Sequence, residues 1–126
     1  MSVHEIIADS TAKGPYSTAI RAGGFVFLSG QGGVNPVTGE PVSGGFEVEA
    51  RQTIQNIADL LGEAGLGLDN LVQLTCYLTD LADWPQLNEI CVDAMGPTCR
   101  PTRTAVGVAT LPFGLSLEMT AVAYDG

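Results

Sequence analysis

Two charged residues near the end of the chain, Arg103 and Glu118, carry the side chains best suited to chemistry on a small acid. An arginine guanidinium grips a carboxylate through two charge-assisted hydrogen bonds and keeps its proton at neutral pH. Glu118 stands in an otherwise uncharged stretch, where a carboxylate has to be paired or solvated. A solvated glutamate can orient or deprotonate water. The alternative for each residue is a structural ion pair, on the surface or across a subunit interface.

Four further residues offer groups that a small ligand can contact. Tyr16 has a phenol, although a tyrosine at the start of a strand is often packed with its hydroxyl satisfied. Ser29 and Gly30 end an apolar run, and a glycine there lets the backbone approach a ligand closely; the alternative is a simple turn. Asn88 either holds a water molecule or faces solvent.

The sequence gives no sign of a metal, nucleotide or prosthetic group. Cys76, Cys91 and Cys99 form an odd set without C-x-x-C spacing, and His4 is the only histidine. This pattern predicts neither a disulfide framework nor a zinc site. A P-loop and a glycine-rich dinucleotide motif between strand and helix are both missing from the sequence. We therefore expect an enzyme without a cofactor, if the chain is an enzyme.

Length and charge narrow the class further. The 126 residues fit a single domain, residues 1–126. Fourteen acidic against five basic residues give a net charge of −9, which disfavours nucleic-acid binding. No apolar window reaches the roughly 18 residues of a membrane span, and the N-terminus lacks the pattern of a signal peptide. We expect a cytoplasmic protein that does not enter a membrane.

The first third of the chain has the pattern of short strands and a loop. Strands are predicted at residues 4–7, 16–21 and 25–29, with the last two forming a hairpin around a Gly-Gly turn and the third ending at Gly30. Residues 31–45 are rich in glycine and proline, so a loop is predicted there.

The remainder alternates between helix and strand. Apolar residues at three- and four-residue spacing predict an amphipathic helix from Phe46 to a stop at Gly65, and a second helix that Asp83 begins, with Trp84 in the core. Alternating apolar residues predict a strand over residues 72–78. Closing strands are predicted at residues 104–108 and 115–124.

This order predicts an α+β fold in which two helices cover one face of a mixed sheet. In the last strand Leu117 and Met119 point one way and Glu118 points the other, because side chains alternate. Another subunit is the simplest cover for the second face, and the apolar composition suits an interface.

Nine short motifs, in order along the chain, together resemble one family. They are Gly14-Pro15-Tyr16-Ser17, Ser29-Gly30-Gln31, Asn35-Pro36-Val37-Thr38-Gly39, Gln52-Thr53, Asn56, Ala64-Gly65-Leu66, Asn88, Arg100-Pro101-Thr102-Arg103-Thr104-Ala105-Val106 and Leu111-Pro112. With this spacing the chain resembles the RidA family, also called YjgF or the reactive intermediate deaminase family, over nearly its whole length.

The resemblance implies a chorismate-mutase-like (YjgF-like) fold and a homotrimer in which the sheet faces form a central barrel. It also implies three clefts between subunits and cofactor-free hydrolytic deamination of 2-aminoacrylate-type enamines and their 2-imino tautomers to 2-keto acids and ammonia. The expected partners are thus a small 2-imino or 2-keto acid and further copies of the chain, with a functional link to pyridoxal-phosphate enzymes.

Residue roles follow from the same resemblance. Arg103 would bind the substrate carboxylate and Glu118 would position the attacking water, while Tyr16, Ser29, Gly30 and Asn88 would line the cleft.

Two departures from the family pattern concern the pocket. Ala105 occupies a position where several members have cysteine, which leaves only its main-chain carbonyl for a substrate. Gly32-Gly33 stand where an isoleucine or similar residue is usual.

Other functions stay open at this point. The chain could be a non-catalytic trimer that binds small carboxylates and regulates a partner, or a pathway-specific deaminase of a different enamine. The family is sometimes labelled endoribonuclease; the negative charge and the lack of a histidine near the predicted cleft disfavour that function here.

Overall fold

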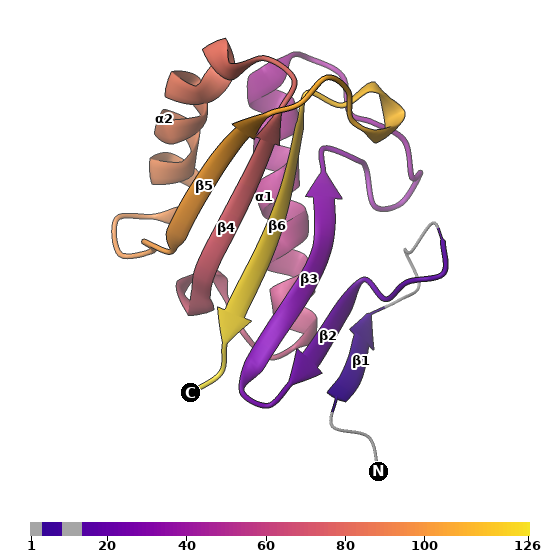
Figure 1. Cartoon of the computed structure of the whole chain (residues 1–126), viewed down its shortest axis with the longest axis vertical. Helices are drawn as coiled ribbons and strands as arrows, with labels where there is room; N and C mark the ends of the chain where they lie inside the picture. The colour runs from indigo at the N-terminus through magenta and orange to yellow at the C-terminus, as the bar shows by residue number, and fades with distance from the viewer. Residues whose placement is uncertain (1–3, 9–13) are drawn as a thin grey trace.

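Two helices and a six-stranded sheet make up the computed structural model, which describes residues 4–8 and 14–126 (Figure 1). The elements are β1 (His4–Ala8), β2 (Ala19–Ala22), β3 (Phe25–Gly32), α1 (Phe46–Glu63), β4 (Leu71–Leu78), α2 (Trp84–Met95), β5 (Thr102–Gly107) and β6 (Leu117–Tyr124). Both helices lie on the same face of the sheet (Figure 1). The predicted α+β class and the order of elements are confirmed.

The sheet runs β1-β2-β3-β6-β4-β5, so the C-terminal strand lies at its centre. Among the strand pairs of the described residues, only β4–β5 is parallel, and α2 makes the crossover that such a pair needs. The predicted hairpin is β2–β3, closed at Gly23, which adopts a left-handed φ of 61°.

The core lies between the helices and the three central strands. Ile57 and Leu61 of α1 are buried against Leu117 and Met119 of β6. Glu118, between the last two, is only half-buried, as the alternation predicted. The helical side of β6 is therefore apolar and the other side carries the carboxylate.

Several strand boundaries differ from the prediction: β5 spans Thr102–Gly107 instead of residues 104–108, and β6 begins at Leu117 instead of Leu115. β2 begins at Ala19 instead of Tyr16, because residues 14–18 form bends and irregular chain before the strand. β3 does not end at Gly30 but continues to Gly32, with an irregularity in its pairing to β6 between Leu28 and Gln31. A bulge of this kind keeps the strand in the sheet while changing where its residues point.

Two predicted core positions are wrong. Trp84 is 45% exposed. It is the first residue of α2 and lies outside the core, into which Leu87 and Ile90 of the same helix pack. Val72 is exposed as well, since the pairing of β4 with β6 shifts between Leu71 and Gln73 and turns Leu71 inward instead.

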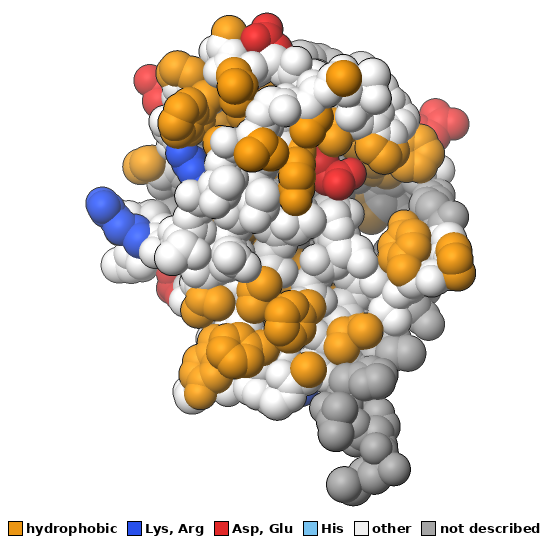
Figure 2. Space-filling model, in the orientation of Figure 1, with side chains coloured by type: hydrophobic (Ala, Val, Ile, Leu, Met, Phe, Trp, Pro, Cys, Tyr) orange, Lys and Arg blue, Asp and Glu red, His pale blue; other side chains and the backbone are white. Residues whose placement is uncertain are grey.

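The face of the sheet away from the helices is open in the single chain. Figure 2 shows this face, with hydrophobic side chains gathered at its lower end, where β3 begins and β6 ends. Phe25, Phe27 and Tyr124 are exposed there, with the Phe25 and Tyr124 rings 5.0 Å apart. None of the helices in the described parts of the chain is long and apolar enough to cross a bilayer.

Candidate active site

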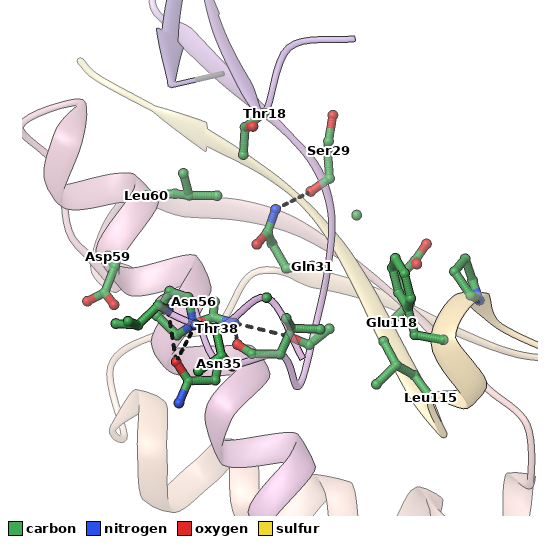
Figure 3. Close-up of a pocket in the computed structure, with 18 of the residues that line it drawn as sticks. Thr18, Ser29, Gln31, Asn35, Thr38, Asn56, Asp59, Leu60, Leu115 and Glu118 are labelled. Atoms are coloured by element: carbon green, nitrogen blue, oxygen red, sulfur yellow. Dashed lines mark hydrogen bonds between the residues drawn. The ribbon is translucent and has the colours of Figure 1, made fainter. Parts of the chain in front are cut away.

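A cavity of about 540 Å³ opens beside β3 and β6 (Figure 3). Its walls come from the end of β3, the 33–39 loop, the outer side of α1 and the segment before β6. Four predicted site residues line it, namely Tyr16, Ser29, Gly30 and Glu118. We call these four the acidic half-site.

Gly30 and Glu118 are in direct contact at one end of the cavity. A Cβ atom built on Gly30 would lie 2.6 Å from Oε2 of Glu118, closer than real atoms approach. Glycine therefore serves here by leaving space for the carboxylate. The β3 bulge next to Gly30 is a common feature beside active sites, where it re-aims the chain.

Ser29 is tied to the protein by both of its donors. Its hydroxyl donates to the carbonyl of Ser17 at 2.7 Å, and its backbone N–H donates to the carbonyl of Thr18 at 2.9 Å. The residue thereby fixes residues 17–18 against β3. If Ser29 contacts a substrate, as predicted, it does so through atoms other than its hydroxyl hydrogen and its backbone N–H.

Glu118 and Tyr16 both reach into the open part of the cavity. Burial raises the pKa of Glu118, because partial removal of water disfavours the charged carboxylate. A glutamate with a raised pKa exchanges a proton more readily near neutral pH. The Tyr16 ring is 51% exposed, so the alternative of a fully packed tyrosine does not hold in the single chain.

Two other predicted residues, Asn88 and Arg103, lie at a different place, a groove of about 440 Å³ between α2 and β5. There Arg103 donates a hydrogen bond to Oδ1 of Asn88. Cys91 lines the same groove, and burial raises the pKa of its thiol while the Arg103 charge opposes that change. We call Asn88, Cys91 and Arg103 the arginine half-site.

Ala105 does not line this groove. It pairs with Cys76 on β4 and is packed partly against the core. Burial raises the pKa of Cys76 to about 11, which describes an inert, protonated thiol. The methyl side chain of Ala105 contributes packing, and its carbonyl stays the only predicted point of contact.

Within one chain, Arg103 and Glu118 leave the sheet on opposite faces. Arg103 pairs with Leu74 of β4, and Glu118 pairs with Tyr77 of the same strand. Paired residues share a face and successive residues alternate, so residues three apart point in opposite directions. The two Cα atoms are also offset by roughly 10 Å along the strands and roughly 10 Å across them. One chain therefore holds two separate half-sites.

Sequence reasoning missed the residues that frame the cavity from below. The Asn56 side chain of α1 donates to the carbonyls of Gly32 and Val34 at 3.0 and 2.9 Å, which anchors the 33–39 loop. Asn56 appeared only as a family motif, and its place on the half-buried side of α1 was the available signal. In Figure 3 it lies next to Asn35 and Thr38 of the loop.

Glu49 was also missed as a structural anchor. Its carboxylate accepts hydrogen bonds from the backbone N–H groups of Ser116 and Leu117, at 2.7 and 2.9 Å. A Cβ on Gly33 would lie 2.7 Å from the Glu49 carbonyl, so this loop residue packs directly on α1. Glu49 lies in the first turn of α1, where a carboxylate also interacts favourably with the helix dipole.

The Gly32 departure has a local compensation. A Cβ at this position would meet Cδ1 of Leu115 at 2.4 Å. Leu115 is buried and fills the space next to Gly32, so the wall of the cavity is apolar here although position 32 has no side chain.

The described residues contain no group of three or more His, Cys, Asp or Glu side chains placed to hold one metal ion. The two half-sites together offer a carboxylate, a phenol, a hydroxyl, an amide, a thiol and a guanidinium. Together these groups can bind a small carboxylate, orient water and move a proton.

Comparison with known proteins adds an independent result. Residues 7–125 match the family model described as Endoribonuclease L-PSP. A RutC family protein of Pyrococcus abyssi is 42% identical over 111 residues, which are 88% of this chain and 87% of the relative. The human 2-iminobutanoate/2-iminopropanoate deaminase is 39% identical over 122 residues, which are 93% of this chain and 88% of the relative.

Solved structures agree with the sequence matches. The crystal structure of RidA from the Antarctic bacterium Psychrobacter sp. superposes with a TM-score of 0.86 at 37% identity, covering 98% of this chain and 99% of the other. The mixed sheet with two helices on one face is thus the fold of these proteins. On the family match, these identities and the shared fold, the chain belongs to the RidA/YjgF family.

Proposed function

We propose that the protein is a hydrolytic deaminase of 2-imino acids and their 2-enamino tautomers. In this proposal the active site is completed when the acidic half-site of one subunit meets the arginine half-site of a neighbour in a homotrimer. The observation that carries it is the position of Arg103 and Glu118 on opposite faces of one sheet, since a closed ring brings such faces together. The family membership and the name of the human relative support the reaction class.

The chemistry needs three groups. Arg103, steadied by Asn88, binds the substrate carboxylate and fixes the position of C2. Glu118 takes a proton from a water molecule as the water oxygen bonds to C2 and the C=N electron pair moves to nitrogen. Glu118 returns this proton to nitrogen, which gives a carbinolamine with a hydroxyl and an amino group on C2. The hydroxyl proton then moves to nitrogen as the C–N bond breaks and the C=O bond forms, so ammonia and a 2-keto acid leave.

The raised pKa of Glu118 suits this exchange, because the residue has to accept and return a proton in one turnover. The imine hydrolyses slowly without help, so the enzyme only has to position the reactants and stabilise charge. The reaction that supplies the substrate would be a pyridoxal-phosphate lyase or dehydratase that releases an enamine.

The test is a coupled assay in which an amino-acid dehydratase makes the imine in situ. We expect faster keto-acid release on adding the protein, and a loss of the effect in Arg103→Ala. Saturable keto-acid binding without any change in rate would instead indicate a non-catalytic carboxylate-binding protein. Light scattering checks the trimer, which a monomer or dimer mass would contradict.

Endoribonuclease activity is a second candidate because the family model carries that description. The net charge of −9 per chain repels a phosphate backbone, and imine hydrolysis accounts for both half-sites without RNA. RNA cleavage by nuclease-free protein, abolished by Arg103→Ala, would favour that candidate over the deaminase.

A further inference from the structure

Phe113 is the one non-glycine residue with a positive φ among residues 4–8 and 14–126, at φ 61° and ψ 18°. The left-handed conformation is energetically unfavourable for a residue that has a Cβ atom. Its neighbour Gly114 also has a positive φ of 69°, so the segment before β6 makes a sharp, strained turn. Strain of this kind on a bulky residue is concentrated at ligand-binding sites.

The turn presents the Phe113 ring to the cavity of the acidic half-site. The side chain is 60% exposed yet lines the same cavity as Glu118. Pro112 and Leu115 line the cavity on either side of it, and Leu115 fills the space beside Gly32, which pairs with Glu118. An apolar surface therefore begins directly next to the reacting carboxylate.

Several polar side chains of the cavity are already occupied by the protein. Asn56 donates to two backbone carbonyls, Gln31 donates to the carbonyl of Ser29, and Asn35 accepts from the N–H groups of Val37 and Thr38. A ligand that competed for these groups would have to break existing hydrogen bonds. A ligand with an apolar substituent breaks none of them.

The charge of the cavity disfavours a second acidic group. Asp59 and Glu63 of α1 line its wall in addition to Glu118, and no lysine or arginine from residues 4–8 or 14–126 lines it. The carboxylate of Asp59 accepts from Gln55 at 2.8 Å. The charged groups that the described part of the chain offers to an acidic substrate side chain here are therefore all carboxylates.

We propose that this cavity selects 2-imino acids whose side chain is apolar and larger than a methyl group, with Phe113 as the specificity-determining residue. The inference rests on the proposed function. With the carboxylate held by the arginine of a neighbouring subunit and C2 beside Glu118, the side chain extends along Leu115 onto the Phe113 ring. A cavity of about 540 Å³ lies within the range of drug-sized ligands, far above the need of a three-carbon acid.

The experiment compares imines that an amino-acid oxidase generates from alanine, leucine, phenylalanine, lysine and glutamate. We expect kcat/KM in wild type to be highest for the leucine or phenylalanine imine and lowest for the glutamate imine. Phe113→Ala keeps the Cβ and the backbone strain but removes the ring. It should lower the ratio of leucine to alanine kcat/KM by on the order of tenfold.

Two further variants separate the ring from the fold. Phe113→Asn suits a left-handed residue and should lower the ratio equally, with no loss of thermal stability. Trp84→Leu removes an exposed aromatic ring outside both half-sites and should leave the ratio at the wild-type value.

An unchanged leucine-to-alanine ratio in Phe113→Ala, or a preference for the glutamate or lysine imine, would overturn the specificity inference while the deaminase stands. Failure to accelerate any imine would overturn the proposed function itself.

Discussion

The two half-sites are built in different ways. The acidic half-site is held by close backbone approach, with Gly30 against the Glu118 carboxylate and Ser29 bonded to residues 17 and 18. The arginine half-site is held by side chains, with the Arg103 guanidinium bonded to Asn88 on an exposed surface of α2. The acidic half-site is thus part of a cavity formed by the backbone, and the arginine half-site is an open groove in which a guanidinium can bind an anion.

This difference separates the roles in the reaction. A carboxylate that exchanges protons has to be partly shielded from water, which the cavity provides and which raises the pKa of Glu118. A guanidinium stays charged whether or not it is shielded from water, so Arg103 only has to be oriented toward the substrate carboxylate. Under the proposed function, each chain thus carries a carboxylate in a cavity and a guanidinium in an open groove, and the reaction needs both.

The largest expected effect is the removal of the anion anchor. Arg103→Ala should lower kcat/KM by on the order of 10³-fold, because the carboxylate loses its only strong partner. Its melting temperature should change little, since the guanidinium lies in an open groove. Arg51→Ala, which breaks surface ion pairs to Glu47 and Asp93, is the matched control and should keep wild-type activity. Equal losses in both variants would contradict the anchor.

Replacing the shielded carboxylate should have the next largest effect. Glu118→Gln should lower kcat by on the order of 10²-fold, because an amide does not accept a proton from water. The pKa of Glu118 is higher in the folded protein than in the unfolded chain. The protonated carboxyl group therefore contributes fully to the stability of the fold below the unfolded pKa, and this contribution is lost as the pH rises through the folded pKa.

The stability of Glu118→Gln should therefore match wild type at acid pH and exceed it slightly at neutral pH, by at most about 1 kcal/mol because water screens the carboxylate. Denaturant unfolding at several pH values measures this. A variant less stable than wild type at neutral pH would show that Glu118 is paired in the fold.

Two glycine variants test how the cavity is held. A Cβ on Gly30 meets the movable end of Glu118, so Gly30→Ala should displace the carboxylate and cost up to about 10²-fold in kcat with little change in stability. A Cβ on Gly33 meets the Glu49 backbone, so Gly33→Ala should cost about 1–3 kcal/mol of folding free energy. The reverse pattern, in activity and thermal melts, would refute this division.

The smallest effect is expected at Asn88. Its amide oxygen only steadies the guanidinium, so Asn88→Ala should raise KM roughly tenfold, the worth of one hydrogen bond to a charged group. Asn88→Asp keeps the acceptor and adds a charge that competes with the substrate, so its KM should rise further. Steady-state kinetics distinguish this from a change in kcat, which would place Asn88 nearer the reacting atoms.

Local patterns in the sequence predicted most of the fold. The helical spacing of Ile54, Ile57 and Leu61 predicted α1, and alternation placed Glu118 opposite Leu117 and Met119. These predictions depend only on a residue and its near neighbours, which is why they are confirmed.

The remainder depends on tertiary packing. Both β3 and β4 pair irregularly with β6, a strand that lies far from β3 in the sequence. The residues next to Gly30 and Val72 therefore do not predict that β3 continues past Gly30 or that Val72 is exposed. The exposure of Trp84 follows from where α2 lies on the sheet. Phe113 adopts a left-handed conformation because the chain turns sharply there before β6. A phenylalanine in the sequence does not predict such a conformation.

The division between the two half-sites also lies beyond the sequence alone. Arg103 and Glu118 were predicted to act together, and the parallel pairing of β5 with β4 is what places them on opposite faces. The sequence motifs identified Arg103 and Glu118 as site residues but did not predict that they lie apart within one chain.

Mixing two inactive variants tests most directly whether the site is shared between subunits. Arg103→Ala and Glu118→Gln are unfolded together at equal amounts, refolded and assayed for imine hydrolysis. If each site takes its arginine and its glutamate from different chains of a closed ring, random assembly leaves about one quarter of the sites intact, and roughly that share of wild-type activity should return. Activity no higher than that of the separate variants, in a mixture shown to have formed mixed oligomers, would contradict the shared site.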